Sequence, residues 1–222
     1  MQGLMQSRSL SLPLLMDHIE GQFSTRTVTT GQVASTMRIT FGELGQRIRR
    51  TAAVLDALEV PAQARVGTFA WNTQRHLELY MAVPCANRVL HTLNHRLFSA
   101  QLVHIIDDAQ DDVLFIDRSI LTSVWDVVRN RSSVRHIVVI DDGDASPLPD
   151  DPRIVDYESL MSSVSPAAED FWIEDDRSAA ALCYTSGTTG SPKGVLYDHR
   201  SIVLHALTLL SPSTRSGSAA ET

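Results

Sequence analysis

Short runs of Val, Ile and Leu alternate with helix-like patterns through the middle of this chain, and this alternation limits the fold more than any other feature. The predicted strands lie at 66–70, 89–93, 113–116 and 136–140. The predicted helices lie at 75–86, 99–106 and 120–128. Strands joined through helices require crossover connections, so neighbouring strands run parallel, and uninterrupted apolar runs fit strands buried on both faces. The sequence therefore predicts an α/β fold with a mostly parallel sheet flanked by helices.

Local signals mark several ends of these elements. Thr40 and Glu43 have the spacing of a capping box at the start of a helix that Pro61 closes. Ser99 is the expected N-cap of the helix at 99–106. The segment 25–36 is expected to form an extended hairpin or a loop, 141–152 a solvated surface loop without calcium-binding spacing, and 157–164 a short helix.

Composition excludes several classes of protein. The chain has 222 residues, of which 43% are apolar and 20% charged, as in ordinary globular domains. A net charge of −7 disfavours a broad surface for nucleic acid, so no nucleic-acid partner is expected. The two cysteines, Cys85 and Cys183, have no metal-binding or disulfide-framework spacing and are expected to be reduced thiols, which predicts a cytoplasmic location. No apolar run approaches a transmembrane length, while peripheral membrane contact stays open.

The segment from Thr185 to Gly194 carries the chemistry. It reads Thr-Ser-Gly-Thr-Thr-Gly-Ser-Pro-Lys-Gly and lies between two apolar strand-like runs, at 179–184 and 195–197. Its glycines allow close backbone approach to a ligand, and its hydroxyls can donate to phosphate oxygens or coordinate a hard cation. Consecutive amides in such a turn form an anion-binding concavity, and Lys193 adds the segment's only positive charge. These are the properties that a triphosphate site requires.

Two other interpretations of this segment are weaker. A flexible Gly/Ser/Thr linker would join domains, whereas this segment connects two strands and contains Pro192 and Lys193. A Walker A loop needs Gly-Lys-Ser/Thr after Gly and four residues, but here Gly194 follows Lys193. Ordinary P-loop ATPase or GTPase chemistry is therefore disfavoured.

Residues 184–195, Tyr-Thr-Ser-Gly-Thr-Thr-Gly-Ser-Pro-Lys-Gly-Val, resemble the phosphate-loop signature of the adenylate-forming (AMP-binding) enzymes. Thr-Phe-Gly-Glu-Leu at 40–44, Val-Leu-His-Thr-Leu-Asn at 89–94 and Tyr-Asp-His-Arg at 197–200 are similar to the fatty-acyl-CoA ligase branch. The resemblance extends from about Leu14 to about Leu210.

The resemblance implies an ATP-dependent ligase with Mg²⁺ and with coenzyme A as co-substrate. A fatty acid or other carboxylate would form an acyl-adenylate and pyrophosphate, and the thiol of coenzyme A would then displace AMP. Carried over from the family, Thr185 would bind the metal and Lys193 would be the catalytic residue. The residues assigned to the nucleotide are Thr185, Ser186, Gly187, Thr188, Thr189, Gly190 and Lys193.

The sequence lacks several segments that members of the family carry further along the chain. A later Tyr-Gly-x-Thr-Glu segment, a ribose-binding Asp and a C-terminal domain with a catalytic Lys do not occur here. We therefore expect 1–210 to be a partial, N-terminal AMP-binding domain, 211–222 a disordered tail, and the chain alone to be inactive and prone to association at its open sheet edge. The alternative is a non-catalytic nucleotide-binding or interaction module, and a homodimer stays open.

Several conspicuous residues are interpreted as structural. His91 and His95 are expected to pack or lie on the surface rather than bind metal, and His199 leaves capping and ligand contact equally open. The tryptophans are expected in the core, at positions Trp71, Trp125 and Trp172. The arginines of the helix after Thr40 are expected on a solvated face, at positions Arg47, Arg49 and Arg50.

Overall fold

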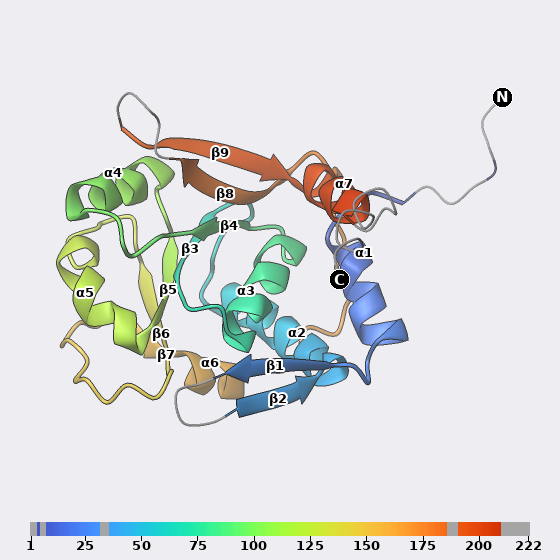
Figure 1. The fold of residues 1–222 in the computed structure, drawn as a ribbon, viewed down its shortest axis with the longest axis horizontal. Coiled ribbons are helices and arrows are strands. Elements are labelled where there is room, and N and C mark those ends of the chain that lie inside the picture. Colours follow the sequence, from blue (N-terminus) through green and yellow to red (C-terminus); the bar gives the residue numbers. More distant parts are fainter. Residues whose placement is uncertain (1–3, 5–7, 32–35, 186–190, 210–222) are drawn as a thin grey trace, which may run out of the picture.

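The computed structural model describes residues 4, 8–31, 36–185 and 191–209, and within them one large sheet organises the chain (Figure 1). The strand order is β7-β6-β5-β3-β4-β8-β9. Six of these strands pair in parallel: β3 (Arg65–Phe69), β4 (Val89–Thr92), β5 (Val113–Asp117), β6 (His136–Ile140), β7 (Ile154–Asp156) and β8 (Ala179–Thr185). The edge strand β9 (Lys193–Asp198) runs antiparallel to β8. The predicted α/β class with a mostly parallel sheet is confirmed.

Helices cover this sheet, and a small hairpin lies beside it. The principal helices are α2 (Phe41–Ala57), α3 (Gln74–Cys85), α4 (Ser99–Ala109), α5 (Arg118–Val128), α6 (Tyr157–Ser163) and α7 (His199–Leu209). The N-terminal region, which has little sequence pattern, contains α1 (Pro13–Asp17) and a π-helical turn at His18–Gln22. The extended segment predicted at 25–36 is half of an antiparallel pair, β1 (Thr27–Gly31) with β2 (Thr36–Thr40).

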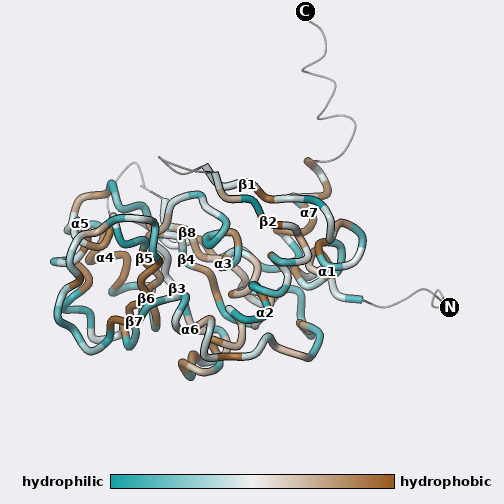
Figure 2. Tube along the Cα trace, turned by 90° about the horizontal axis from the view of Figure 1, so that it is seen from below, coloured by the Kyte–Doolittle hydropathy of each residue, from teal (hydrophilic) through white to brown (hydrophobic). Residues whose placement is uncertain are grey.

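Both faces of the central strands are buried, which explains their uninterrupted apolar sequences. In β5, Leu114 and Ile116 join the cluster that packs against α4 and α5, whereas Val113 and Phe115 join the cluster that packs against α2, α3 and α6. All four side chains are fully buried. Figure 2 shows the apolar stretches along these inner strands, with hydrophilic segments on the outside. A strand that contacts helices on both sides has no solvent-facing positions to fill with polar residues.

Capping signals in the sequence predicted two helix starts, of which one is confirmed and the other is displaced by one residue. The capping box of α2 is confirmed: the Thr40 hydroxyl accepts from the Glu43 amide at 3.1 Å, and the Thr40 amide donates to Glu43 Oε2 at 2.7 Å. The bond from the Thr40 amide, together with one from the Thr40 hydroxyl to Glu43 Oε2, lowers the pKa of Glu43. The N-cap predicted at Ser99 is wrong, because Phe98 holds that position and its amide donates to the side chain of Gln101 at 3.2 Å. A glutamine three residues into the helix supplies the cap that a serine was expected to supply.

Arg47 and Arg49 do not lie on a solvated face, so that prediction is wrong for both. Arg47 donates to the fully buried carboxylate of Glu78 at 2.6 Å and to Glu158 at 2.8 Å. Gln74 and Tyr157 also donate to Glu78, at 2.7 and 2.8 Å. Arg49 pairs with Glu20 at 2.7 Å, and only Arg50 is exposed. A buried carboxylate needs such partners because its desolvation is otherwise uncompensated.

The tryptophan prediction is also wrong for two of the three residues. Trp125 packs partly buried against the core, but Trp71 is 41% and Trp172 64% exposed. Apolar exposure also occurs on the edge strand, where Leu196 is 61% exposed, and on α7, where Leu207 is 52% exposed. Association at this edge stays a prediction. None of the helices in the described part of the chain has the length and apolar character needed to cross a bilayer.

Replacing Arg47 should destabilise the fold far more than replacing Arg50 on the same helix. Arg47→Ala leaves Glu78 buried without its cation, so we expect the free energy of unfolding to fall by about 3–5 kcal/mol. Arg50→Ala, the matched control, should change it by less than about 0.5 kcal/mol. Urea unfolding of the two variants measures both effects, and equal losses would contradict the role given to Arg47.

Candidate functional site

The signature segment connects β8 and β9 at the carboxyl end of the parallel strands. β8 runs parallel to β4, and its last residue, Thr185, is paired with Lys193, the first residue of β9. Both residues are exposed. The Lys193 ammonium forms no ion pair with any described residue. The hairpin therefore presents a hydroxyl and a free cation opposite each other, at the sheet edge where ligands bind in open α/β folds.

Five of the residues assigned to the nucleotide lie outside the described residues: Ser186, Gly187, Thr188, Thr189 and Gly190. The expected tail at 211–222 lies outside them as well. Thr185, assigned to the metal, and Lys193, assigned to catalysis, lie at exposed positions that suit these roles. Both roles stay predictions. A single exposed hydroxyl can supply one oxygen to Mg²⁺, an ion that usually keeps waters and phosphate oxygens as its other ligands.

Helix α4 holds both arms of the hairpin, a feature that sequence reasoning missed. The Tyr184 hydroxyl, adjacent to Thr185, donates to Asp108 Oδ2 at 2.6 Å. On the other arm, His104 Nε2 lies 3.3 Å from the Pro192 carbonyl oxygen. His104 and Asp108 are four residues apart and so share one face of α4. Burial, followed by the bond to Asp108, raises the pKa of Tyr184. In the sequence, the available signal for these contacts was the pair of polar side chains four residues apart on an amphipathic helix.

A buried contact between His91 and Asp111 lies behind the hairpin. His91 Nδ1 is 2.8 Å from Asp111 Oδ1, and both side chains are completely buried. Burial raises the pKa of Asp111, with His91 opposing the shift. His95 instead packs edge-on against Trp71, with ring centroids 5.0 Å apart. In the described ranges no group of three or more His, Cys, Asp or Glu is arranged to hold a metal ion.

His199 is a packing residue at the far end of β9. Its side chain is fully buried, and its Nδ1 accepts from the Leu12 amide at 3.4 Å. Burial lowers the pKa of its imidazole. It lies six positions after Lys193, roughly 20 Å along an extended chain. Its contact in the structure is with the N-terminal segment.

Asp117 ends β5 on the same carboxyl edge as the hairpin. Its side chain is 1% exposed, its Oδ2 accepts from the Trp71 amide at 2.5 Å, and its Oδ1 has no partner among the described residues. Burial raises the pKa of Asp117 to about 6, although the bond from Trp71 opposes this shift. The carboxyl is thus poised to change charge near neutral pH.

Comparisons with known proteins agree on one family. A family profile described as "AMP-binding enzyme" matches residues 19–219. The 3-methylmercaptopropionyl-CoA ligase of Ruegeria lacuscaerulensis is 39% identical over 93% of this chain and 38% of its own length. The medium-chain-fatty-acid–CoA ligase of Ectopseudomonas oleovorans is 35% identical over 100% of this chain and 41% of its own length. The chain thus spans about two fifths of the length of these curated relatives.

A solved structure confirms the fold. The crystal structure of the anthranilate CoA ligase AuaEII in complex with anthranoyl-AMP superposes with a TM-score of 0.77. The match covers 91% of this chain and 37% of that chain at 18% sequence identity. At this identity the likeness concerns the fold alone.

Removing the Tyr184 hydroxyl should loosen the hairpin from α4. Tyr184→Phe deletes the hydrogen bond to Asp108, so we expect the free energy of unfolding to fall by about 1 kcal/mol. The exposed Tyr197 on β9 provides the control, and Tyr197→Phe should stay within about 0.5 kcal/mol of the unchanged protein. Chemical denaturation followed by far-UV circular dichroism measures both, and matching values would refute the link to α4.

Stability should fall as pH rises through the titration of Asp117. An unfolded aspartic acid has a pKa of about 3.9. The raised native pKa means that the folded state holds the proton more tightly, and this contribution is lost as pH passes about 6. Compared with Asp117→Asn, the unchanged protein should lose about 2–3 kcal/mol of unfolding free energy between about pH 4 and about pH 7.5. Urea unfolding at both pH values checks this, and a pH-independent difference would contradict it.

Proposed function

Because this chain belongs to the AMP-binding enzyme family, we propose that its β8–β9 hairpin binds the polyphosphate of ATP as part of an acyl-CoA ligase. The observation that carries the proposal is the pairing of Thr185 with Lys193 at the exposed end of the hairpin. Residues 186–192, which are rich in glycine and hydroxyl groups, connect these two positions along the chain. A cation and several donors on one turn match the charge of a triphosphate.

The proposed reaction has two steps. A carboxylate oxygen of the substrate attacks the α-phosphorus of ATP, the bond to the β-phosphate breaks, and pyrophosphate leaves. The sulfur of coenzyme A then attacks the acyl carbonyl carbon, AMP leaves, and the thiol proton passes to solvent. In this scheme Lys193 neutralises charge on the β- and γ-phosphates, and the Thr185 hydroxyl orients the Mg²⁺–phosphate complex. Bound Mg²⁺ supplies further charge neutralisation.

The substrate class follows from the relatives. Relatives that share 35–39% identity with this chain are named as ligases of 3-methylmercaptopropionyl, medium-chain and long-chain fatty acyl groups, whereas the ligases named for benzoate and trans-cinnamate share 27–32%. We therefore propose an aliphatic carboxylic acid, with coenzyme A as acceptor. The thiols of Cys85, which is buried, and Cys183, which is half-buried, are both free. Free thiols fit a reducing compartment, so the cytoplasm is the proposed location.

Lys193 offers an unusually clean test, because it is the only lysine in the chain. We expect Mg²⁺–ATP to bind the unchanged protein and to bind Lys193→Ala roughly 10-fold more weakly or worse, since a direct charge-assisted contact is lost. Lys193→Arg keeps the charge and should retain most of the affinity. Isothermal titration measures all three.

Amine-directed acetylation followed by mass spectrometry provides a second readout. Mg²⁺–ATP should protect Lys193 from modification while leaving the α-amino group unprotected. The nucleotide site would be overturned if no heat of binding is measured at millimolar ATP. It would also be overturned if ATP does not change the acetylation of Lys193.

Release of pyrophosphate distinguishes the two classes of function. A ligase that is active as this chain alone releases pyrophosphate from ATP when an aliphatic acid is added. A non-catalytic nucleotide-binding module binds ATP without releasing pyrophosphate. Our expectation from the sequence is binding without release, and measured turnover would correct it.

A further inference from the structure

The side chain of Tyr184 crosses the hairpin and ties its first arm to α4. Its ring lies over Gly194 of β9, the residue that pairs with it across the two strands. A methyl group at position 194 would lie 3.2 Å from Tyr184 Cζ and 3.4 Å from its hydroxyl oxygen. The ring therefore occupies the space that a side chain at this position would need. Beyond Gly194, the Tyr184 hydroxyl donates to Asp108 Oδ2 at 2.6 Å.

The second arm of the hairpin is tied to the same helix. His104 places its Nε2 3.3 Å from the carbonyl oxygen of Pro192. His104 lies four residues before Asp108, so both bonds come from one face of α4, which Figure 1 shows beside the end of the hairpin. Pro192 directly precedes Lys193. The contact with His104 thus holds the chain next to the proposed phosphate-binding cation.

The two functional side chains lie on the other face of the hairpin. Successive side chains of a strand point to opposite faces, so Thr185 faces away from the side on which Tyr184 reaches α4. Lys193 is paired with Thr185 and shares its face. The Tyr184 ring also lies 5.2 Å from the ring of His91, whose buried side chain contacts Asp111. The back of the hairpin is thus held against the protein, and its front is left to a ligand.

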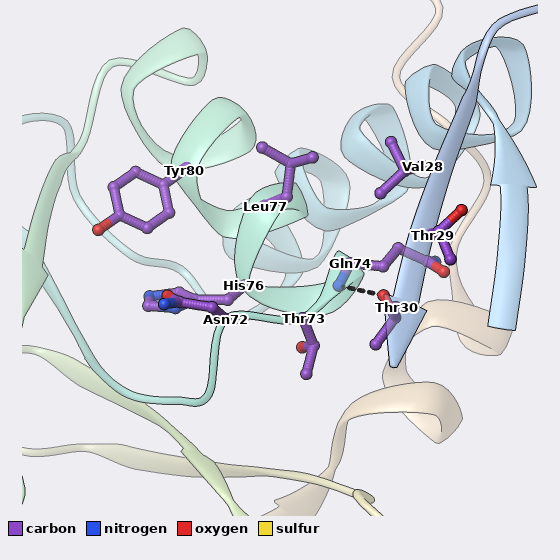
Figure 3. A pocket seen from close by; sticks show the side chains of 9 residues that line it. All are labelled: Val28, Thr29, Thr30, Asn72, Thr73, Gln74, His76, Leu77 and Tyr80. Atoms are coloured by element: carbon purple, nitrogen blue, oxygen red, sulfur yellow. Dashed lines mark hydrogen bonds between the residues drawn. The ribbon is translucent and has the colours of Figure 1, made fainter. Parts of the chain in front are cut away.

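The pocket beside β1 is separate from this arrangement. It has a volume of about 290 Å³ and lies between β1 and the start of α3 (Figure 3). Its lining includes Thr30, Leu77 and Tyr80 but no residue of the hairpin or of α4. A change on the exposed face of α4 should therefore act on the hairpin without altering this pocket.

We propose that Asp108 and His104 are positioning residues, which set the affinity for the nucleotide by holding the two arms of the hairpin in place. The inference rests on the function proposed above, in which Thr185 and Lys193 bind the Mg²⁺–polyphosphate complex. Groups that are held in place before the ligand arrives lose less conformational entropy when it binds. Loss of either contact should therefore weaken nucleotide binding, although both residues lie behind the hairpin.

Substitutions of Asp108 test this role, because its side chain is exposed and the core is left intact. Asp108→Asn keeps an oxygen that can accept from Tyr184, whereas Asp108→Leu has a similar shape and no acceptor. Both variants lose the same negative charge, so their difference reports the hydrogen bond rather than the charge. We expect isothermal titration to show roughly 5-fold weaker binding of Mg²⁺–ATP by Asp108→Leu than by Asp108→Asn.

His104 is tested on the other arm in the same way. His104→Ala should weaken the binding of Mg²⁺–ATP roughly 3-fold or more. His104→Gln keeps a side-chain N–H that can donate to the Pro192 carbonyl oxygen, and should restore most of the affinity. Full affinity of folded His104→Ala would overturn the role of this residue.

Two controls separate positioning from a general loss of structure. Asp126 is exposed on α5, and Asp126→Leu should bind Mg²⁺–ATP like Asp126→Asn. In the Tyr184→Phe background the hydroxyl is missing, so Asp108→Leu and Asp108→Asn should bind equally. Thermal unfolding verifies that each variant is folded at the temperature of the titration.

The outcomes distinguish this inference from the proposed function. If the unchanged protein binds Mg²⁺–ATP while Asp108→Leu and Asp108→Asn bind it equally, the positioning role of Asp108 is overturned and the nucleotide site stands. A difference between these variants that persists in the Tyr184→Phe background overturns that role as well. If the unchanged protein does not bind Mg²⁺–ATP, the nucleotide site and this inference both fail.

Discussion

Burial of the parallel sheet on both faces is the constraint on which the rest of this structure depends. Because α4 and α5 cover one face while α2, α3 and α6 cover the other, the interior strands are mostly apolar, and their few buried polar side chains need partners. Parallel strands also end on the same edge. Thr185 of β8 and Asp117 of β5 therefore reach a single rim although nearly seventy residues separate them. The position of the candidate nucleotide site is a consequence of how the core is buried.

Charged groups inside this apolar frame are held in specific pairs. Glu78 is fully buried yet accepts hydrogen bonds from Arg47, Gln74 and Tyr157, which join α2, α3 and α6 on one side of the sheet. His91 and Asp111 form a second buried pair close to the hairpin. Such pairs add little net stability compared with apolar packing, but they are costly to break. Their effect here is to fix how the covering helices are placed relative to the strands.

The hairpin between β8 and β9 combines two arms held by α4 with an exposed charge. At the hairpin, α4 holds Tyr184 and Pro192, and the chain presents an uncompensated cation to solvent at Lys193. This arrangement suits a highly charged, hydrated ligand.

The sequence by itself determined the fold class, most element positions and the capping box at Thr40, and it supplied the hypothesis for the chemistry of the segment from Thr185 to Gly194. These are local properties: periodicity, capping and loop composition act over a few residues. Only the tertiary structure decided the burial of Arg47 against Glu78, the exposure of Trp71, the cap at Phe98 and the contacts of α4 with the hairpin. Each depends on residues that are distant in sequence or on the competition between neighbouring side chains. The local sequence pattern does not specify which distant residue a side chain will contact in the folded protein.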